Sequence, residues 1–131
     1  MRYLLDTNVV VDLIRNNDSV IKHLVKCGAE NCCISDYSLY ELFYGVYKSG
    51  YAEREFQVVS KIVNCFEVVP FSDYVLEASR QKNYLEKKGQ KIEDADVLIG
   101  SASVAKNCVL VTNNIKHMSR LDGVTIENWR D

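Results

Sequence analysis

Short apolar segments alternate with helical patterns along the whole chain, and this alternation restricts the folds that are open to it. Five segments have strand character, at residues 3–5, 32–34, 68–69, 109–111 and 124–126. Helical patterns fall between them, at residues 9–15, 19–26, 36–47, 52–65, 72–88 and 94–106. Strands that alternate with helices form parallel sheets covered on both faces. The sequence therefore predicts an α/β fold with a central, mostly parallel five-stranded sheet flanked by helices on both faces.

The length and composition of the chain are typical of one globular domain. Its 131 residues are 47% hydrophobic and 26% charged, as in ordinary globular proteins. No apolar run approaches the roughly 20 residues that a membrane span needs, and the N-terminus lacks the pattern of a secretory signal. The sequence contains no internal repeat or linker. We therefore expect a single domain over residues 1–131, located in the cytoplasm.

The cysteines do not have the spacing of a zinc site or of a disulfide framework. There are five of them, an odd number, and no C-x-x-C pair occurs. Cys32 and Cys33 are neighbours on a predicted strand, so alternation sends their side chains to opposite faces of the sheet. We expect reduced, mostly buried thiols.

Asp6 follows the first predicted strand directly and is the first candidate functional residue. The chain turns polar at Asp6, Thr7 and Asn8 before the next helical pattern begins. In an open α/β sheet, ligands bind in the crevice outside the carboxyl ends of the strands. Asp6 is therefore placed to hold a metal ion or to take part in chemistry. The alternative is that one of these three residues simply caps the following helix.

Glu41 is a second candidate, because it lies within an apolar stretch of a predicted helix. Its neighbours include Leu39, Leu42 and Phe43. A buried acid at this position would be costly unless it were paired or bound to a cation. A solvent-facing helix acid is the alternative interpretation, and the segment alone favours it.

A third candidate, Asp96, belongs to an acidic cluster at the start of a predicted helix. Glu93 and Asp94 are explained by the helix dipole, which favours acids in the first turn. Asp96 instead shares a face with Gly100 and Ser103. Glycine inside a helix costs roughly 1 kcal/mol relative to alanine. The small residues therefore predict close approach of a neighbouring strand, a metal or a substrate.

The fourth predicted strand is followed by the polar residues Thr112, Asn113 and Asn114. They either contribute to the same site as the acids or form an Asn-rich turn.

Carboxylates that converge on one place raise each other's pKa unless a divalent cation neutralises them. Oxygen ligands without His or Cys favour Mg²⁺ or Mn²⁺. A cation held in this way lowers the pKa of a bound water and stabilises in-line attack on phosphorus. The pattern thus predicts phosphodiester hydrolysis.

These segments together resemble the PIN-domain ribonucleases, and among them the small VapC-type toxins of bacterial and archaeal toxin–antitoxin pairs. The resemblance spans the whole chain in the family's order and spacing. The matching segments are Leu5-Asp6-Thr7-Asn8, Glu41-Leu42, residues 92–99, Val111-Thr112-Asn113-Asn114, residues 121–124 and Asn128-Trp129.

The resemblance implies a PIN domain over residues 1–131 that acts as a Mg²⁺-dependent (or Mn²⁺-dependent) endoribonuclease. It implies that Asp6, Glu41 and Asp96 are the catalytic, metal-binding acids, with Thr112 and Asn114 beside them. It also implies a VapB-type antitoxin as partner, and a homodimer. Many relatives have an aspartate at the position of Asn114, so this chain has a neutral ligand or water-positioning group there, which leaves open how tightly a second metal would bind.

The charge of the chain is uneven. The net charge is −2, which argues against a general nucleic-acid coat, but five basic residues fall within twelve positions. They are Arg80, Lys82, Lys87, Lys88 and Lys91. A solvated helix face is the simpler interpretation, and an RNA-binding track that includes Lys87, Lys88 and Lys91 is the functional one.

Tyrosines recur at steps of three and four residues through and beyond the helix that carries Glu41. They are Tyr37, Tyr40, Tyr44, Tyr47 and Tyr51. A core stripe is one interpretation, but a buried tyrosine needs a hydrogen-bond partner, whereas tyrosine is favoured at interfaces. We therefore predict that Tyr40 and Tyr44 lie in the homodimer contact or in the groove for an antitoxin segment. Trp129 is expected to form an apolar lid on the sheet edge.

Other classes of protein fit the sequence less well. A haloacid dehalogenase-type phosphatase would have a second aspartate at the position of Asn8, and a receiver domain would need a phospho-acceptor aspartate directly after a middle strand. A PIN-like RNA-binding module that has lost catalysis is the remaining alternative, and Asn114 is its only support. His117 follows Asn114 on the same turn and is a further candidate for contact with substrate.

Overall fold

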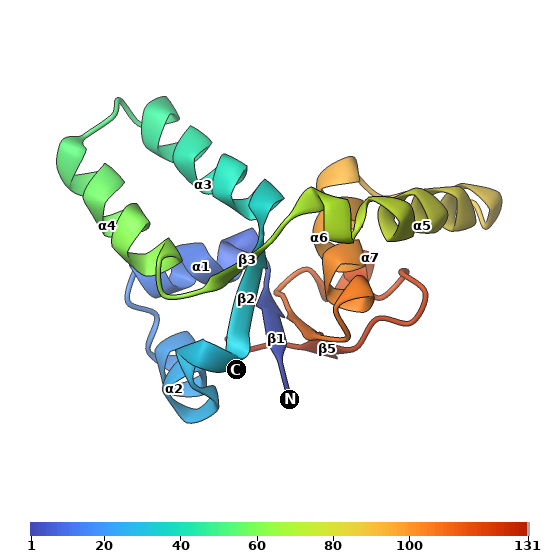
Figure 1. Ribbon diagram of the computed structural model, residues 1–131, viewed down its shortest axis with the longest axis horizontal. Coiled ribbons are helices and arrows are strands. Elements are labelled where there is room, and N and C mark those ends of the chain that lie inside the picture. The colour runs from blue at the N-terminus through green and yellow to red at the C-terminus, as the bar shows by residue number, and fades with distance from the viewer. Residues whose placement is uncertain (131) are drawn as a thin grey trace.

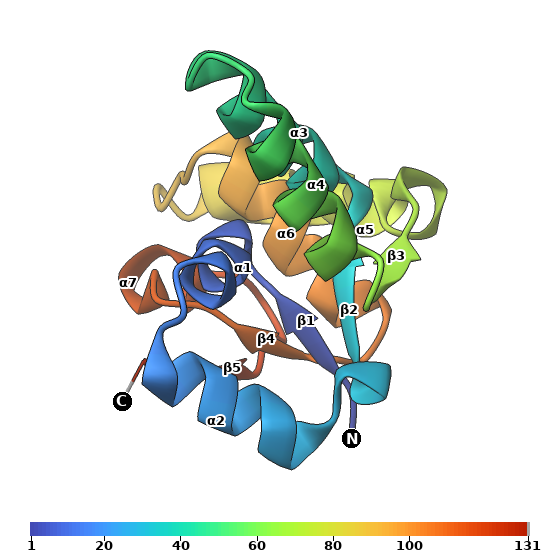
Figure 2. The same ribbon diagram turned by 90° about the vertical axis from the view of Figure 1, so that its left-hand side faces the viewer.

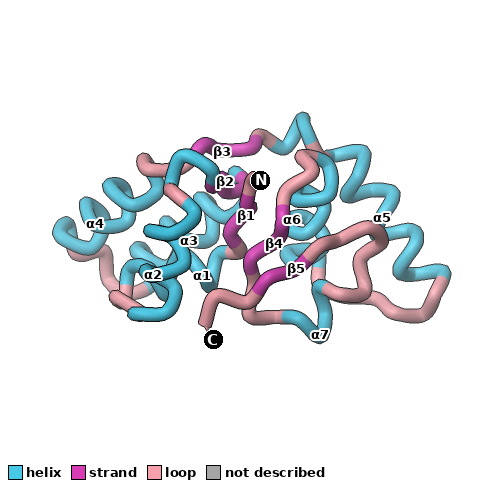
Figure 3. The backbone as a smooth tube through the Cα atoms, turned by 90° about the horizontal axis from the view of Figure 1, so that it is seen from below, coloured by secondary structure: helices cyan, strands magenta, loops and turns pink. Residues whose placement is uncertain are grey.

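The computed structural model describes residues 1–130, which form a five-stranded sheet between two layers of helices (Figure 1). The strands are β1 (Tyr3–Leu5), β2 (Cys32–Ser35), β3 (Glu67–Val69), β4 (Val109–Val111) and β5 (Ile126–Glu127). They are ordered β3-β2-β1-β4-β5, and every neighbouring pair is parallel. Figure 3 shows the strands in this order. The predicted α/β fold with a five-stranded parallel sheet is confirmed.

The helices divide between the two faces of the sheet. They are α1 (Thr7–Ile14), α2 (Asp18–Cys27), α3 (Asp36–Lys48), α4 (Glu53–Val63), α5 (Val75–Lys87), α6 (Asp94–Ala105) and α7 (Ile115–Met118), with short 3-10 turns η1 (Ala29–Asn31) and η2 (Phe71–Asp73). Figures 1 and 2 show α1 to α4 on one side and α5 and α6 on the other. None of the helices in residues 1–130 is both long and apolar enough to cross a membrane.

The central strands are buried on both faces, which explains why they are apolar without alternation. Leu4 of β1 belongs to the core under α5 and α6, whereas its neighbour Leu5 belongs to the core under α1, α3 and α4. Cys33 and Cys32 divide in the same way, as predicted from their alternation. The sheet therefore separates two apolar cores.

Ser35 and Gly89 mark the ends of two helices, and one predicted helix begins later than expected. Ser35 Oγ accepts a hydrogen bond from the N–H of Ser38 at 3.2 Å and so caps α3. Gly89 follows the end of α5 with a φ of +65°, a left-handed conformation that suits glycine. The helix expected from residue 72 begins at Val75 instead. The Asp36 carboxylate accepts hydrogen bonds from Phe71 N–H and Tyr74 Oη, and these bonds stabilise the 3-10 turn η2 before the helix.

The C-terminal part differs from the predicted boundaries. The fifth strand covers Ile126–Glu127 rather than residues 124–126, and α7 was not predicted. The two elements have two and four residues, about one period of a strand or helix pattern each, so neither shows a repeated pattern. In addition, α3 ends at Lys48, which places Tyr51 beyond the helix.

Trp129 is fully buried, but it packs against α2 and the central strand β1 rather than over an edge strand as predicted. Its ring stacks on His23, with 5.7 Å between ring centroids and 12° between planes, and it also contacts Tyr3 at 5.7 Å. Ser19 Oγ donates a hydrogen bond to the carbonyl oxygen of Trp129 at 2.7 Å. The residue therefore ties the C-terminal segment to α2 and β1.

Candidate active site

The carboxyl ends of β1 and β4, the start of α1, the second turn of α3 and the first two turns of α6 enclose one acidic pocket. α3 and α6 contact each other beyond these strand ends (Figure 1). The pocket has a volume of about 150 Å³. Its lining residues are Asp6, Thr7, Asn8, Glu41, Glu93, Ala95, Asp96, Ile99 and Asn114. The structure thus brings the three acids expected from the sequence to one place.

Asp6 is held rigidly at the end of β1. Its side chain is only 5% exposed. Thr112 Oγ1 donates a hydrogen bond to Asp6 Oδ2 at 2.7 Å, and the N–H of Thr7 donates to Oδ1 at 2.8 Å. Asp6 is therefore both the cap of α1 and a wall of the pocket, so both interpretations of its position hold. Burial raises the pKa of Asp6 in spite of these two hydrogen bonds.

Glu41 lies in the second turn of α3 and faces the same pocket. Thr7 Oγ1 donates a hydrogen bond to Glu41 Oε1 at 2.6 Å. The alternative of a fully solvent-facing acid is therefore wrong, because Glu41 is partly buried and bonded to a residue that follows β1.

Asp96 lies in the first turn of α6, opposite Asp6. Asn114 Nδ2 donates a hydrogen bond to Asp96 Oδ2 at 3.1 Å, and His117 Nδ1 lies 4.0 Å from the same oxygen. Burial raises the pKa of Asp96, and the negative charges of Asp6 and Glu93 raise it further. This repulsion is what the convergence of carboxylates predicts.

Thr112 and Asn114 lie beside the acids, as expected. The N–H of Asn114 donates a hydrogen bond to Thr112 Oγ1 at 3.0 Å, and Thr112 in turn donates to Asp6. One short loop after β4 therefore orients Asp6 through Thr112 and Asp96 through the side chain of Asn114.

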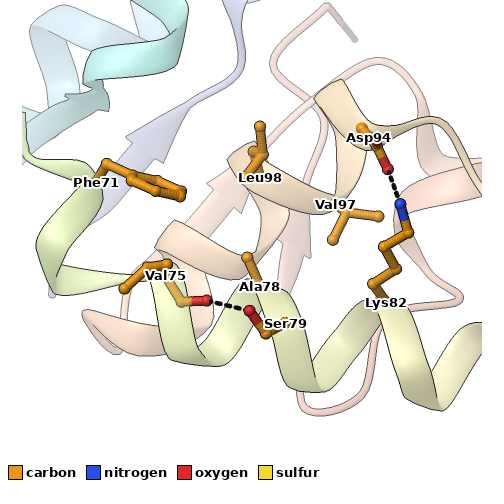
Figure 4. A pocket seen from close by; sticks show the side chains of 8 residues that line it. All are labelled: Phe71, Val75, Ala78, Ser79, Lys82, Asp94, Val97 and Leu98. Carbon is orange, nitrogen blue, oxygen red and sulfur yellow. Dashed lines mark hydrogen bonds and ion pairs between the residues drawn. The ribbon is translucent and has the colours of Figure 1, made fainter.

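Asp94, the competitor of Asp96, points elsewhere. It lines a separate hollow of about 200 Å³ between α5 and α6, together with Phe71 and Leu98. Its Oδ1 is paired with Lys82 Nζ at 3.0 Å (Figure 4). Of these two aspartates, Asp96 therefore lines the acidic pocket and Asp94 does not.

The acidic pocket suits a divalent cation by its chemistry. Its charged lining residues are Asp6, Glu41, Glu93 and Asp96, all of them carboxylates, and its remaining polar side chains also offer oxygen atoms. Hard cations such as Mg²⁺ and Mn²⁺ prefer these ligands. Within residues 1–130, however, no three acidic, His or Cys side chains already surround one point. The acids share a pocket in which their oxygens are held by hydroxyl and amide donors.

The face of α6 that carries the small residues Gly100 and Ser103 serves packing rather than ligand binding. A Cβ atom at Gly100 would lie 2.1 Å from Leu121 Cδ1 and 3.4 Å from Met118 Sδ. The close neighbours are thus side chains from α7 and the segment after it. The expectation of a strand, metal or substrate at Gly100 is wrong, and the residue fixes α6 against α7.

The basic segment divides into paired and unpaired residues. Arg80 pairs with Glu77 at 2.6 Å and with Asp122 at 3.1 Å, and Lys82 is bound to Asp94. Lys91 lines a hollow of about 330 Å³ with Ile92, Glu93 and His117, and this hollow shares Glu93 with the acidic pocket.

Lys87 and Lys88 lie at the end of α5, where both are exposed. Lys88 Nζ donates to Tyr84 Oη at 3.1 Å. These two lysines and Lys91 make no ion pair within residues 1–130, so they remain candidates for contact with a phosphate backbone.

Most of the tyrosine stripe lies on the surface, whereas Tyr37 packs against the core. Tyr40, Tyr44 and Tyr47 are 66%, 56% and 66% exposed. The core interpretation is therefore wrong for these residues, and an interface role stays open for Tyr40 and Tyr44.

Two acids of this region were not singled out from the sequence. Glu93 precedes α6 directly and faces the pocket, although the helix dipole was a sufficient explanation for it. Asp12 is buried and accepts two hydrogen bonds of 2.9 Å from Arg130 and one of 3.1 Å from Asn113. Arg130 lowers the pKa of Asp12. Its partners lie about a hundred residues away, so no local pattern could reveal this pair.

Comparison with known proteins gives consistent matches. The family model described as PIN domain matches residues 3–124. "Ribonuclease VapC2" of Rickettsia felis is 36% identical over 132 residues, and "tRNA(fMet)-specific endonuclease VapC" of Salmonella typhimurium is 29% identical over 130 residues. Each alignment covers 98% of this chain and 98% of the relative.

A solved structure has the same fold. It is that of VapBC2 from Rickettsia felis bound to a DNA fragment from their promoter, and it superposes with a TM-score of 0.90 at 35% identity. The match covers 98% of this chain and 99% of that chain.

Proposed function

Because this chain belongs to the PIN domain family, we propose that it is an endoribonuclease and the toxin of a VapBC-type toxin–antitoxin pair. The relatives named as VapC ribonucleases align over nearly their whole length, which supports one PIN domain over residues 1–131. We further propose that the protein acts in the cytoplasm on RNA and that a VapB-type antitoxin restrains it.

The observation that carries this proposal is the acidic pocket at the strand ends. Asp6, Glu41 and Asp96 line it, and two of them have a pKa that burial raises. Such a group of buried negative charges is best stabilised by a cation. We propose that these three residues hold Mg²⁺ or Mn²⁺, which when bound supplies an activated water and offsets charge at the scissile phosphate.

The surrounding residues would keep the carboxylates in place during this reaction. Thr112 holds Asp6, Asn114 holds Asp96 and Thr7 holds Glu41. Asn114 is neutral, so this pocket has one negative charge fewer than it would have with an aspartate there. We propose that one cation is sufficient for hydrolysis by this chain.

The function is tested by incubating the purified protein with a tRNA pool and with a single-stranded RNA. We expect endonucleolytic cleavage in MgCl₂ or MnCl₂ and none in excess chelator. Cleavage that persists in chelator would contradict a metal-dependent nuclease. RNA that is bound but stays intact in both metals would instead support the RNA-binding module.

We predict that Lys87 and Lys88 contact the RNA backbone. Lys87→Glu/Lys88→Glu should weaken binding of a single-stranded RNA, measured in the Asp96→Asn background to prevent cleavage. Each lost phosphate contact lowers the slope of log K against log salt by about 0.7. Lys22→Glu, on α2, is the control and should keep the slope. An unchanged slope in the α5 variant would assign these lysines to solvation alone.

We predict that Tyr40 and Tyr44 lie in a partner interface, either with the antitoxin or with a second copy of this chain. Tyr40→Ala and Tyr44→Ala should each weaken that association about tenfold or more, since tyrosines at interface centres often contribute over 1 kcal/mol. Affinity is measured for the co-expressed antitoxin and, separately, for the homodimer. Val25→Ala, an exposed position on α2, is the control. Unchanged affinity in both assays would refute the interface.

A further inference from the structure

A series of hydroxyl groups leads from the end of β2 to the carboxylate of Glu41. Thr7 Oγ1 lies 2.6 Å from Glu41 Oε1 and 2.8 Å from Ser38 Oγ. Ser38 Oγ lies 3.3 Å from Ser35 Oγ. Both serines are fully buried, so their hydroxyl groups must find partners within the protein.

Counting hydrogens gives this series a single direction. Each hydroxyl carries one hydrogen, and the Glu41 carboxylate can only accept. Thr7 Oγ1 is placed to donate either to Glu41 Oε1 at 2.6 Å or to Ser38 Oγ at 2.8 Å, and its single hydrogen goes to the shorter, charge-assisted bond with Glu41. The contact between Thr7 and Ser38 is then a hydrogen bond through the hydrogen of Ser38. Ser38 donates to Thr7, and Ser35 donates to Ser38, while Ser35 Oγ accepts from the N–H of Ser38 at 3.2 Å.

The direction of the series matters for Glu41. A hydroxyl that accepts one hydrogen bond donates a second more strongly, because neighbouring bonds polarise one another. The donation from Ser38 thus keeps the hydrogen of Thr7 pointing at Glu41 Oε1. One oxygen of Glu41 is fixed, and with it the direction of the carboxylate in the pocket.

We propose that Ser38 is a positioning residue for the acidic pocket and acts through Thr7 to orient Glu41 for the cation. The proposal rests on the proposed function in one respect, which is that Glu41 is a ligand. Ser38 itself lies outside the set of residues that line the pocket.

The test measures Mn²⁺ affinity of the purified protein by electron paramagnetic resonance, with no RNA present. Residues that orient metal ligands typically contribute 10- to 100-fold in affinity. Ser38→Ala should weaken Mn²⁺ binding by about tenfold or more, and Ser38→Thr, which keeps the hydroxyl, should restore it. Thr7→Val should also weaken binding. In that background Ser38→Ala should add nothing further, because its only route to Glu41 is already broken.

Ser101→Ala is the matched control. Ser101 is also fully buried, but its Oγ has no hydrogen-bond partner within residues 1–130. This variant should bind Mn²⁺ like the unaltered protein. Circular dichroism checks the fold of each variant. If Ser38→Ala does not fold, Ser38→Cys replaces it, since a thiol is only a weak donor.

Two outcomes would overturn the role of Ser38. One is unchanged Mn²⁺ affinity in the Ser38 variant while Glu41→Gln binds weakly, and the other is an undiminished effect of Ser38→Ala in the Thr7→Val background. If Glu41→Gln itself binds Mn²⁺ normally, the assignment of Glu41 as a ligand fails instead. The experiment therefore separates failure of this proposal from failure of the proposed function.

Discussion

Replacement of Asp96 by Asn is expected to remove RNA cleavage while leaving the protein folded. Asp96 faces the pocket, and its charge is one of those that would hold the cation. Loss of one group that stabilises a developing charge typically lowers the rate by about 10²- to 10³-fold. Asp6→Asn should act in the same way. Cleavage rates in MgCl₂ measure the effect, and full activity of either variant would refute the assignment.

In chelator, Asp96→Asn should not lower the free energy of unfolding, and at neutral pH it should raise it. An acid whose pKa is raised in the folded state destabilises that state when it is ionised. For Asp96 this penalty is fully present above the raised pKa and disappears as pH falls towards the unfolded value of about 3.9. Asp96→Asn should therefore raise the melting temperature most at neutral pH and least near pH 4. A large loss of stability at pH 7 would mean that Asp96 is a structural residue.

Replacement of Trp129 by Ala is expected to cause the largest loss of stability of any single change considered. The ring is fully buried between α2 and β1. Truncation of a buried tryptophan typically costs 3–5 kcal/mol. Urea unfolding followed by circular dichroism measures the change, because the chain has no other tryptophan for fluorescence.

Tyr40→Ala is the matched control for the tryptophan variant. It removes another large aromatic ring, but one that is 66% exposed. Surface substitutions usually change stability by less than about 0.5 kcal/mol. A loss below about 1 kcal/mol for Trp129→Ala would show that the ring does not contribute to the core.

The fold was predictable because its sheet is parallel and buried. Strands such as Tyr3–Leu5 and Val109–Val111 are apolar on both faces, and helical patterns separate them, so the chain has few alternatives to a layered α/β fold. The position of Asp6 followed from the same logic, since a polar residue directly after a buried strand lies at the sheet's carboxyl edge. The helix α7 and the exact bounds of the edge strand β5 were not predicted, because a segment of four or two residues shows no repeated pattern.

The details of the pocket depend on contacts between distant residues, which a single sequence does not show. Glu93 has a sufficient local explanation in the helix dipole, so its place in the pocket gave no separate signal. The bonds of Thr7 to Ser38 and Glu41 join positions more than thirty residues apart. Asp12 and Arg130 are 118 residues apart. Such pairs are set by how the helices pack on the sheet, and they become visible only in three dimensions.

The central claim is that Asp6, Glu41 and Asp96 share one divalent cation, and anomalous diffraction from crystals grown in MnCl₂ tests it most directly. The account predicts an anomalous peak in the acidic pocket, with carboxylate oxygens of Asp6 and Asp96 at roughly the 2.1 Å expected for such hard cations and with Glu41 bound directly or through one water. The account would be contradicted by a fully active protein whose manganese peak lies outside this pocket.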